Sequence, residues 1–331
     1  MNWVKKSARI PLSEIQSVAC EVKEAIDYSD KADLIARYRG LGLQVDEDPA
    51  SQNVVTLVRQ AIRDCRPFSV IRIGDGEANL LSFGNNVETP FLDRLVAKMV
   101  INQQVDRFKV STNSLYLVKH LMLESVCFAD IVGVRGIYYM GMPDYKIKSP
   151  LEWAVRLKKK PRLIGVLRAE SELLRMANLG YLKGKLIASA NLYLAVINNL
   201  KSLFAEVPKS VILVTDQLES VRLLKTKFPD VHFDVISLPF AGTNQLRLPR
   251  MPSFLPAFEK VLRHDLAGSL VLVGAGPWAE FYCTVAKQRG AVAVDIGSGF
   301  DLLSGRNTRP FHRLLSGTSE DGFLFDAGSQ L

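Results

Sequence analysis

The chain has few of the residues that build zinc, haem or disulfide-rich proteins. Its 331 residues include four cysteines and four histidines. The cysteines are widely separated and lack C-x-x-C spacing, and the histidines form no metal-spaced pair. We therefore expect reduced thiols, with neither a zinc site nor a disulfide framework. The residues concerned are Cys20, Cys65, Cys127, Cys283, His120, His232, His264 and His312.

Two common catalytic motifs are also missing. The chain has no Gly-x-Ser-x-Gly elbow and no Walker A loop, which argues against the common serine hydrolases and P-loop enzymes. It also has no repeat of fixed period and no low-complexity segment. With 48% apolar and 23% charged residues, we expect an ordered globular protein.

Long apolar runs are absent as well. Residues 1–9 lack the apolar run of a signal peptide, and the most hydrophobic window, 269–286, is interrupted by a Gly-Ala-Gly-Pro turn and by Glu280. We expect a cytoplasmic protein. The run Lys158–Lys160 is compatible with a peripheral contact at the inner membrane surface, although charge runs are usually solvated.

The charge that is present is mostly positive. A formal net charge of +8 and a pI near 9.3 favour an anionic partner. Charge alone does not choose between a nucleotide, a lipid head group and nucleic acid.

From residue 68 onward, short runs rich in Val and Ile alternate with helical patterns. This alternation predicts an α/β fold, a Rossmann-like and mostly parallel sheet flanked by helices, with an N-terminal helical extension. The expected strands are 68–73, 129–134, 162–167, 185–189, 210–215, 231–237, 269–274 and 291–296, and the expected helices include 91–105, 192–204, 217–228 and 280–289.

The N-terminal region predicts two helices on either side of the polar segment 46–52. In the first, a capping box from Ser13 to Gln16 precedes apolar residues at helical spacing, namely Ile15, Val18, Val22 and Ile26. The second carries Val54, Val55, Val58 and Ile62. We divide the chain into an N-terminal segment (1–52), a main domain (53–305) and a weakly packed tail (306–331). The proline-rich segment 239–256 is either a loop over the site or an ordinary connection.

The clearest candidate site follows the strand 68–73. Asp75 and Glu77 flank a glycine in the expected loop, and such a pair held about 5 Å apart repels by roughly 3 kcal/mol unless a cation or proton lies between them. Hard oxygen ligands suit Mg²⁺ or Mn²⁺, and the phosphates of a nucleotide diphosphate would complete the coordination of the ion. A surface turn with Glu77 as a helix cap explains the spacing equally well. Arg72 favours the site, because a charge in an apolar strand needs an anion, either one of these carboxylates or a phosphate.

Two further strand ends carry glycines and acids. Gly274, Gly276 and Pro277 form a turn before a helix, where backbone N–H groups can hold an anion, although a turn without ligand is an alternative. Asp295 and Asp301 lie on either side of the glycines that end the last strand. Either could act as a general base or accept hydrogen bonds from hydroxyl groups, or it could only cap a turn or helix.

In this order, the motifs resemble those of the bacterial GT-D-type glycosyltransferases. The resemblance spans about residues 55–305 and rests on Arg72-Ile-Gly-Asp-Gly-Glu77, Gly274-Ala-Gly-Pro277 and Asp295-Ile-Gly297, with weaker echoes at 129–134 and at Leu238-Pro239 leading to Thr243-Asn244. After Asp295-Ile-Gly297 the chain departs from the family, which tends to have histidine and then acids where this chain has Ser298, Gly299, Phe300 and Asp301.

The resemblance implies a Rossmann-like enzyme that transfers a sugar from a nucleotide-sugar donor, often a UDP-sugar, to a hydroxyl of a glycan, lipid-linked or protein acceptor. It implies Asp75 and Glu77 as ligands of Mn²⁺ or Mg²⁺. It places Arg72, Gly74, Gly76 and the Gly274–Pro277 turn beside the donor, together with Thr243 and Asn244, and leaves Asp301 or Asp295 as the base. No nucleic-acid partner is expected.

Two other functions remain open from the sequence. A methyltransferase using S-adenosylmethionine would take Gly274–Pro277 as its cofactor loop, but this leaves Arg72 to Glu77 unexplained. A non-catalytic nucleotide-binding module needs no catalytic base, so it would account for the departure from the family pattern after Gly297.

Overall fold

The computed structural model describes residues 11–22, 31–48, 51–90, 92–93, 112–134, 162–238 and 265–306. Its centre is an eight-stranded sheet in the order β1-β4-β3-β2-β8-β7-β5-β6, and every pairing is parallel. The predicted α/β class is therefore confirmed. The strands are β1 (Gln44–Val45), β2 (Phe68–Ile73), β3 (Ile131–Val134), β4 (Leu186–Ser189), β5 (Val211–Thr215), β6 (Phe233–Ser237), β7 (Leu270–Gly274) and β8 (Val292–Asp295).

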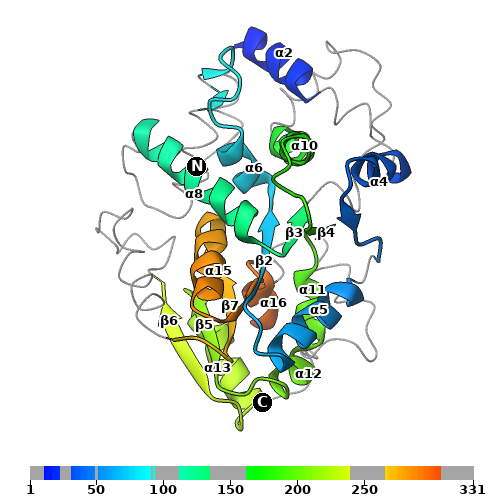
Figure 1. The fold of residues 1–331 in the computed structure, drawn as a ribbon. Helices are drawn as coiled ribbons and strands as arrows, with labels where there is room; N and C mark the ends of the chain where they lie inside the picture. Colours follow the sequence, from blue (N-terminus) through cyan, green and yellow to red (C-terminus); the bar gives the residue numbers. More distant parts are fainter. Residues whose placement is uncertain are drawn as a thin grey trace, which may run out of the picture.

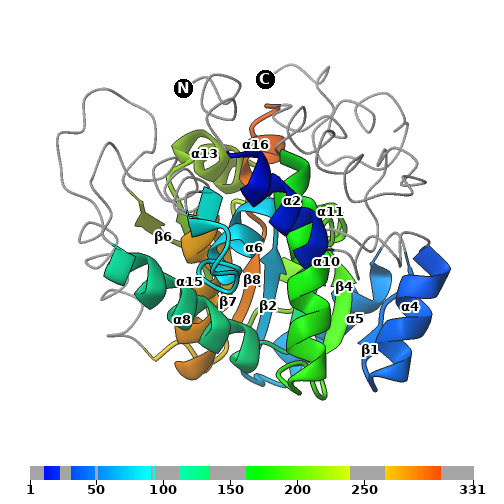
Figure 2. The same cartoon turned by 90° about the horizontal axis from the view of Figure 1, so that it is seen from above.

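Helices cover both faces of this sheet. The described helices are α2 (Leu12–Glu21), α4 (Lys31–Gly40), α5 (Gln52–Arg63), α6 (Asp75–Leu81), α8 (Thr112–Phe128), α10 (Arg162–Asn178), α11 (Tyr193–Asn198), α12 (Leu200–Phe204), α13 (Leu218–Lys227), α15 (Ala279–Gln288) and α16 (Gly299–Leu303), with a 3₁₀ turn η2 (Gly276–Trp278). One apolar core joins the sheet to α6, α8, α10 and α15, and a second joins it to α5, α11, α12, α13 and α16. Figures 1 and 2 show α8 and α15 on the opposite side of β2 from α5 and α11.

The strands form where the sequence has short, nearly continuous apolar runs. Such runs suit parallel strands because both faces are buried under helices. In β2, Val70 pairs with Ile131 of β3 on one side and with Val294 of β8 on the other. Each such aliphatic side chain stabilises the fold by about 1.5–3 kcal/mol when it is fully buried.

The strand order has its switch point at β2 and β8. From β2 the chain builds outward through β3 and β4, and it then crosses to the other half of the sheet, where β5, β6, β7 and β8 lie. In open α/β sheets, ligands bind beyond the carboxyl ends of the strands at such a point. The carboxyl ends of β2 and β8 carry Arg72 and Asp295.

The N-terminal helical extension is present and is docked through both apolar and polar contacts. Ile15, Val18 and Val22 are fully buried, as the helical spacing predicted. The predicted cap at Ser13 is wrong: α2 begins at Leu12 after Pro11, and no side chain caps it. Since proline sets φ near −65° and has no N–H, it suits the start of a helix, and Ser13 falls within the first turn.

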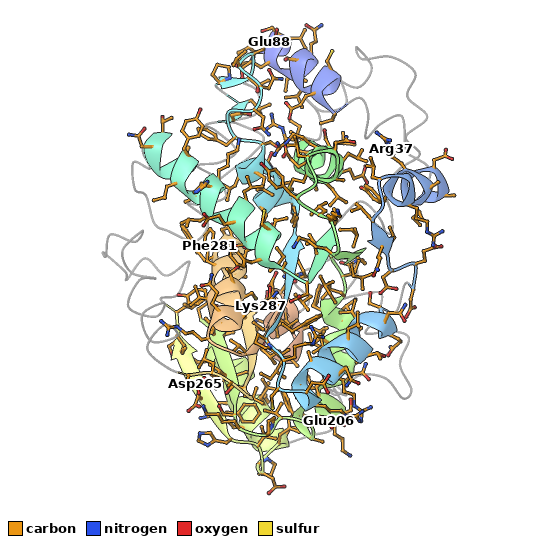
Figure 3. The ribbon with its side chains drawn as sticks, viewed as in Figure 1. Arg37, Glu88, Glu206, Asp265, Phe281 and Lys287 are labelled. Atoms are coloured by element: carbon orange, nitrogen blue, oxygen red, sulfur yellow. The ribbon has the colours of Figure 1, made fainter. Side chains whose placement is uncertain are left out.

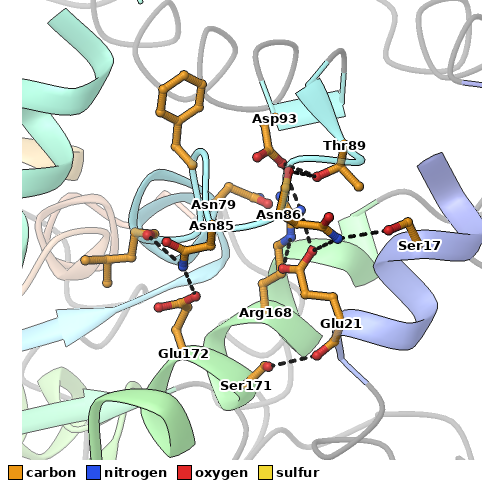
Figure 4. Close-up of polar contacts among 12 residues, drawn as sticks. Ser17, Glu21, Asn79, Asn85, Asn86, Thr89, Asp93, Arg168, Ser171 and Glu172 are labelled. Atoms are coloured by element: carbon orange, nitrogen blue, oxygen red, sulfur yellow. Dashed lines mark hydrogen bonds and ion pairs between the residues drawn. The ribbon is translucent and has the colours of Figure 1, made fainter. Parts of the chain in front are cut away.

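A buried ionic network holds α2 on the main body (Figure 4). Arg168 of α10 is fully buried, and its Nη2 donates to Glu21 Oε2 at 3.0 Å and lies 2.8 Å from Asp93 Oδ1. Ser171 Oγ donates to the backbone oxygen of Glu21 at 3.3 Å, and Asn86 Nδ2 donates to Ser17 Oγ at 3.0 Å. Two carboxylates therefore face the buried guanidinium, although its Nη1 has no hydrogen-bond partner among the described residues.

Two secondary-structure predictions are corrected. Residues 162–167, predicted as a strand, begin the helix α10. The apolar run there is too short to distinguish the two by itself, and the buried residues Ala169, Leu173 and Met176 continue it at helical spacing. The helix predicted over 192–204 is two helices, because the chain breaks at Asn199, whose side-chain Nδ2 donates to Ala195 O at 2.8 Å. The elements β1, α4 and α8 were not predicted.

The other predicted helices and strands are present within a few residues of their expected bounds, including α5 with its four buried aliphatic residues. The helix expected over 91–105 lies mostly outside the described residues, as do the segment 239–256 and the tail after 306. Within the described ranges, no helix combines the length and apolar character needed to cross a bilayer.

An ion pair at the far end of the molecule joins α5 to the segment after α12. Glu206, labelled in Figure 3, accepts hydrogen bonds from Arg59 Nε at 3.0 Å and from Arg63 Nε at 2.8 Å. The hydrogen bonds from Arg63 and then Arg59 lower the pKa of Glu206 to about 2. This network of three side chains contains none of the candidate site residues.

Candidate functional site

Arg72 is the residue around which the site is arranged. Its Nε and Nη2 donate to Oδ2 and Oδ1 of Asp295 at 2.9 and 3.0 Å, and its Nη1 donates to Ala190 O at 3.3 Å. Its guanidinium also lies over the ring of Tyr193, 4.9 Å from the centroid. The sequence predicted an anion for this charge, as Asp75, Glu77 or a phosphate. The carboxylate that makes the bidentate contact with Arg72 is instead Asp295, from the adjacent strand β8.

The turn after β8 leaves room for this pair. Gly297 has a φ of +42°, and a Cβ at this position would collide with Nη2 of Arg72. Any other residue would both strain the backbone and displace the guanidinium. Glycine at this position therefore has a packing reason connected with Arg72.

Asp75 and Glu77 lie in the first turn of α6, with Gly74 as the N-cap, rather than in an extended loop. The side chain of Glu77 folds back toward the cap, so that a Cβ on Gly74 would lie 2.5 Å from Glu77 Oε2. Burial raises the pKa of Glu77, and the charges of Asp75 and Asp295 raise it further. Both residues keep partial exposure, so this side of the site faces outward.

Helix α10 fixes the position of Asp75 from the other side. A Cβ on Gly165 would lie 2.5 Å from Asp75 O and 2.9 Å from Asp75 Cβ. Asn79 Nδ2 donates to the same backbone oxygen at 2.8 Å. The first turn of α6 is thus held between β2 and α10 at a spacing that only glycine at 165 permits.

Sequence reasoning missed Glu280 as a site residue. It lies in the first turn of α15, is 1% exposed, and neither of its carboxyl oxygens has a hydrogen-bond partner. Burial raises its pKa well above the ordinary value, and the charges of Glu77 and Asp295 add to this; its own amide and Arg72 act weakly in the other direction. The signal in the sequence is a single acid in the apolar window 269–286, which by itself indicates only that the window does not span a membrane.

Acidic side chains outnumber basic ones at this place. Glu77, Glu280 and Asp295 influence one another electrostatically, Asp75 adds to the charge near Glu77, and Arg72 is the cation that acts on all three. Burial also raises the pKa of Asp295, against the opposing effect of Arg72. Such a cluster calls for protons, for hydrogen-bond donors or for a further cation.

The donor set fits a hard divalent cation. Carboxylate oxygens suit Mg²⁺ and Mn²⁺, and Asp75 and Glu77 offer such oxygens at the first turn of α6. In the described part of the chain, no group of three or more His, Cys, Asp or Glu residues is placed to hold a metal. A cation held by Asp75 and Glu77 would therefore take its remaining ligands from water and from a bound phosphate.

The other predicted site residues are placed as follows. Gly274 ends β7 and gives room to the ring of Phe300, which a Cβ would strike, and Gly276 and Pro277 begin η2. Asp301 lies in α16, partly exposed, 3.1 Å from Arg306 Nη2. Gly76 lies inside α6. Thr243 and Asn244 lie outside the described residues.

One of the comparisons with known proteins gives a match. A family model described as a GT-D fold-like domain matches residues 50–303, which include the carboxyl ends of β2, β7 and β8. No curated protein and no solved structure matches the chain.

Proposed function

The chain belongs to the GT-D-like family. We propose that it is a glycosyltransferase that transfers a sugar from a nucleotide-diphosphate donor, a UDP-sugar, to an acceptor hydroxyl. The observation that carries the proposal is the group of carboxylates around Arg72 at the carboxyl ends of β2 and β8. It lies at the switch point of the sheet, where α/β folds bind nucleotides.

We assign Asp75 and Glu77 to a divalent cation, Mn²⁺ or Mg²⁺. Bound there, the cation would stabilise the negative charge on the departing diphosphate. Partial exposure of both residues supports this assignment, because a donor can approach them from solvent. The raised pKa of Glu77 supports it too, since an acid destabilised by burial and by neighbouring acids gains most from a cation.

Arg72 and Asp295 have a positioning role in this proposal. Asp295 is 3% exposed, and both of its carboxylate oxygens accept hydrogen bonds from Arg72. Asp301 is partly exposed, so an acceptor hydroxyl arriving from solvent can reach it. We therefore assign the general base to Asp301, which takes the acceptor proton, and assign to Asp295 the task of holding Arg72. The Gly274–Pro277 turn, Thr243 and Asn244 would lie beside the nucleotide or its sugar.

The test is the thermal stability of the protein with UDP. UDP should raise the melting temperature when Mn²⁺ or Mg²⁺ is present and not without them, because the cation joins the diphosphate to the protein. At a hundred times its Kd, a ligand stabilises the folded state by about 2.7 kcal/mol. Asp75→Asn should abolish the effect. Asp234→Asn, at an exposed acid beside His232, is the matched control and should keep it. The proposal would be contradicted if UDP raised the melting temperature equally with and without the metal, or if it still did so in Asp75→Asn.

A donor screen then separates transfer from binding. Mass spectrometry with several nucleotide sugars and metal should show sugar transferred to water or to an acceptor from a glycan, lipid-linked or protein pool. Metal-dependent binding without transfer from any donor would identify a nucleotide-binding module. Stabilisation by S-adenosylmethionine instead of UDP would identify a methyltransferase.

A further inference from the structure

Glu280 has no function in the site as described so far. Its carboxyl group is enclosed at the first turn of α15, and both oxygens lack a hydrogen-bond partner. Buried polar groups in native structures are nearly always hydrogen-bonded, because a group buried without a partner loses its hydrogen bonds to water and gains none in return. An exception of this kind points to a group that is satisfied only when something else is present.

Among the described residues, no side chain donates a hydrogen bond to Glu280. Arg72, the cation that acts on Glu280, directs its Nε and Nη2 to Asp295 and its Nη1 to Ala190 O. The other neighbours that act on Glu280 are the acids Glu77 and Asp295, which repel it. A bound molecule that offers hydrogen-bond donors would therefore satisfy the carboxyl group that the described residues leave without a partner.

We propose that Glu280 binds hydroxyl groups of the transferred sugar and so selects the donor. The inference rests on the proposed glycosyltransferase function and deepens it. A carboxyl group can accept hydrogen bonds from two neighbouring hydroxyls, and sugars carry such pairs. A site built to bond a hydroxyl strongly rejects ligands that lack it.

The position of Glu280 favours the donor sugar over the acceptor. Asp75 and Glu77 are partly exposed, whereas Glu280 is buried and is close enough to Glu77 for the two charges to interact. A donor whose diphosphate lies at Asp75 and Glu77 carries its sugar directly next to that diphosphate. The acceptor arrives later and from outside. Because Glu280 is 1% exposed, binding of the sugar would require the side chains that cover it to move, whereas binding of UDP alone would not.

The experiment compares the affinity for UDP with the affinity for UDP-sugars. Calorimetric titrations at saturating Mn²⁺ measure Kd for UDP, UDP-glucose, UDP-galactose and UDP-N-acetylglucosamine with the wild-type protein and with Glu280→Leu and Glu280→Gln. For the best-bound UDP-sugar, Glu280→Leu should raise Kd about tenfold to a hundredfold, while Kd for UDP changes by less than about twofold. Glu280→Gln should lie between, because its amide oxygen still accepts.

Glu170→Gln is the matched control. Glu170 is also buried, and burial alone raises its pKa, so it has no resolved electrostatic link to the site residues. It should leave both affinities unchanged. Glu280→Leu should also raise the melting temperature, since it removes an unpartnered buried carboxyl group.

Three results would overturn the inference, and they differ from one another. Equal weakening of UDP and UDP-sugars by Glu280→Leu would show that Glu280 acts on the cation. Unchanged affinities for both would show that it contacts neither. Absence of UDP binding by the wild-type protein would refute the glycosyltransferase proposal itself, and the role of Glu280 with it. If Glu280→Leu does not fold, the same comparison is made with Glu280→Gln.

Discussion

Arg72 and Asp295 form a two-point ion pair that joins β2 to β8 at the switch point of the sheet. The two hydrogen bonds measure 2.9 and 3.0 Å, and the side chains are 16% and 4% exposed. A bidentate contact between arginine and a carboxylate sets orientation as well as charge. It therefore defines the geometry of the strand ends against which any ligand would lie.

We expect Asp295→Asn to destabilise the protein by about 3–5 kcal/mol, because it leaves the Arg72 guanidinium enclosed without its anion. Arg72→Lys should cost less, since it keeps the charge but loses the two-point contact. Urea denaturation measures both. The control is Arg306→Gln, which breaks the more exposed pair with Asp301 and should change the free energy of unfolding by less than about 1 kcal/mol. A loss of similar size in Asp295→Asn and Arg306→Gln would show that the buried pair has no special weight.

This pair also shows where sequence reasoning reached its limit. The apolar runs of β2 and β8 predicted both strands, and the polar residues at their ends predicted a site. The pairing itself joins residues 223 positions apart, and nothing local in either segment specifies it. Choosing an anion near Arg72 in sequence therefore favoured Asp75 and Glu77 over the partner that strand order brings beside it.

Glu280 and α10 were misjudged for related reasons. An acid in an apolar window looks like the end of a hydrophobic segment, and only the docking of α15 against β2 shows that it is buried among other acids. The short apolar run at 162–167 fits a strand as well as a helix, and the helical spacing that decides between them continues after residue 168.

Gly165→Ala should shift the first turn of α6 without changing any of the candidate site residues. The new methyl group would lie 2.5 Å from Asp75 O and 2.7 Å from Asn79 Nδ2, so α6 and α10 must separate. We expect a loss of about 1–3 kcal/mol of stability. If the proposed cation site is correct, Mn²⁺ affinity should fall as well, because the shift moves Asp75.

Gly40→Ala is the control for this substitution. Gly40 lies in α4, and a Cβ there would meet nothing within 4 Å. It should leave Mn²⁺ affinity unchanged and should stabilise the protein slightly through helix propensity. Wild-type stability and Mn²⁺ affinity in Gly165→Ala would contradict the close packing of α10 on Asp75.

Glu21→Gln should destabilise the protein by about 3–5 kcal/mol, although Glu21 lies outside the matched family domain. Its carboxylate is one of two that face the fully buried guanidinium of Arg168, as Figure 4 shows. In Arg168→Met the charge is gone, so adding Glu21→Gln should cost far less, and a double-mutant cycle by urea denaturation measures the difference. Additive losses would refute a direct coupling between α2 and α10.

Glu170 should make stability depend on pH between about 4.5 and about 8. Burial raises its pKa in the folded protein from 4.5 to about 8, so the folded state holds a proton over this range that the unfolded state has released. The stability associated with that proton is fully present below pH 4.5 and is lost as pH rises through about 8. Glu170→Gln carries no charge to bury, so it should match the wild-type protein in stability near pH 4.5 and exceed it, by an amount on the order of a few kcal/mol, above pH 8.

Chemical denaturation at several pH values measures the difference, and Glu219→Gln, at an exposed acid paired with Arg222, should show no such trend. A difference between Glu170→Gln and the wild-type protein that stays constant across this range would mean that Glu170 titrates normally in the folded state.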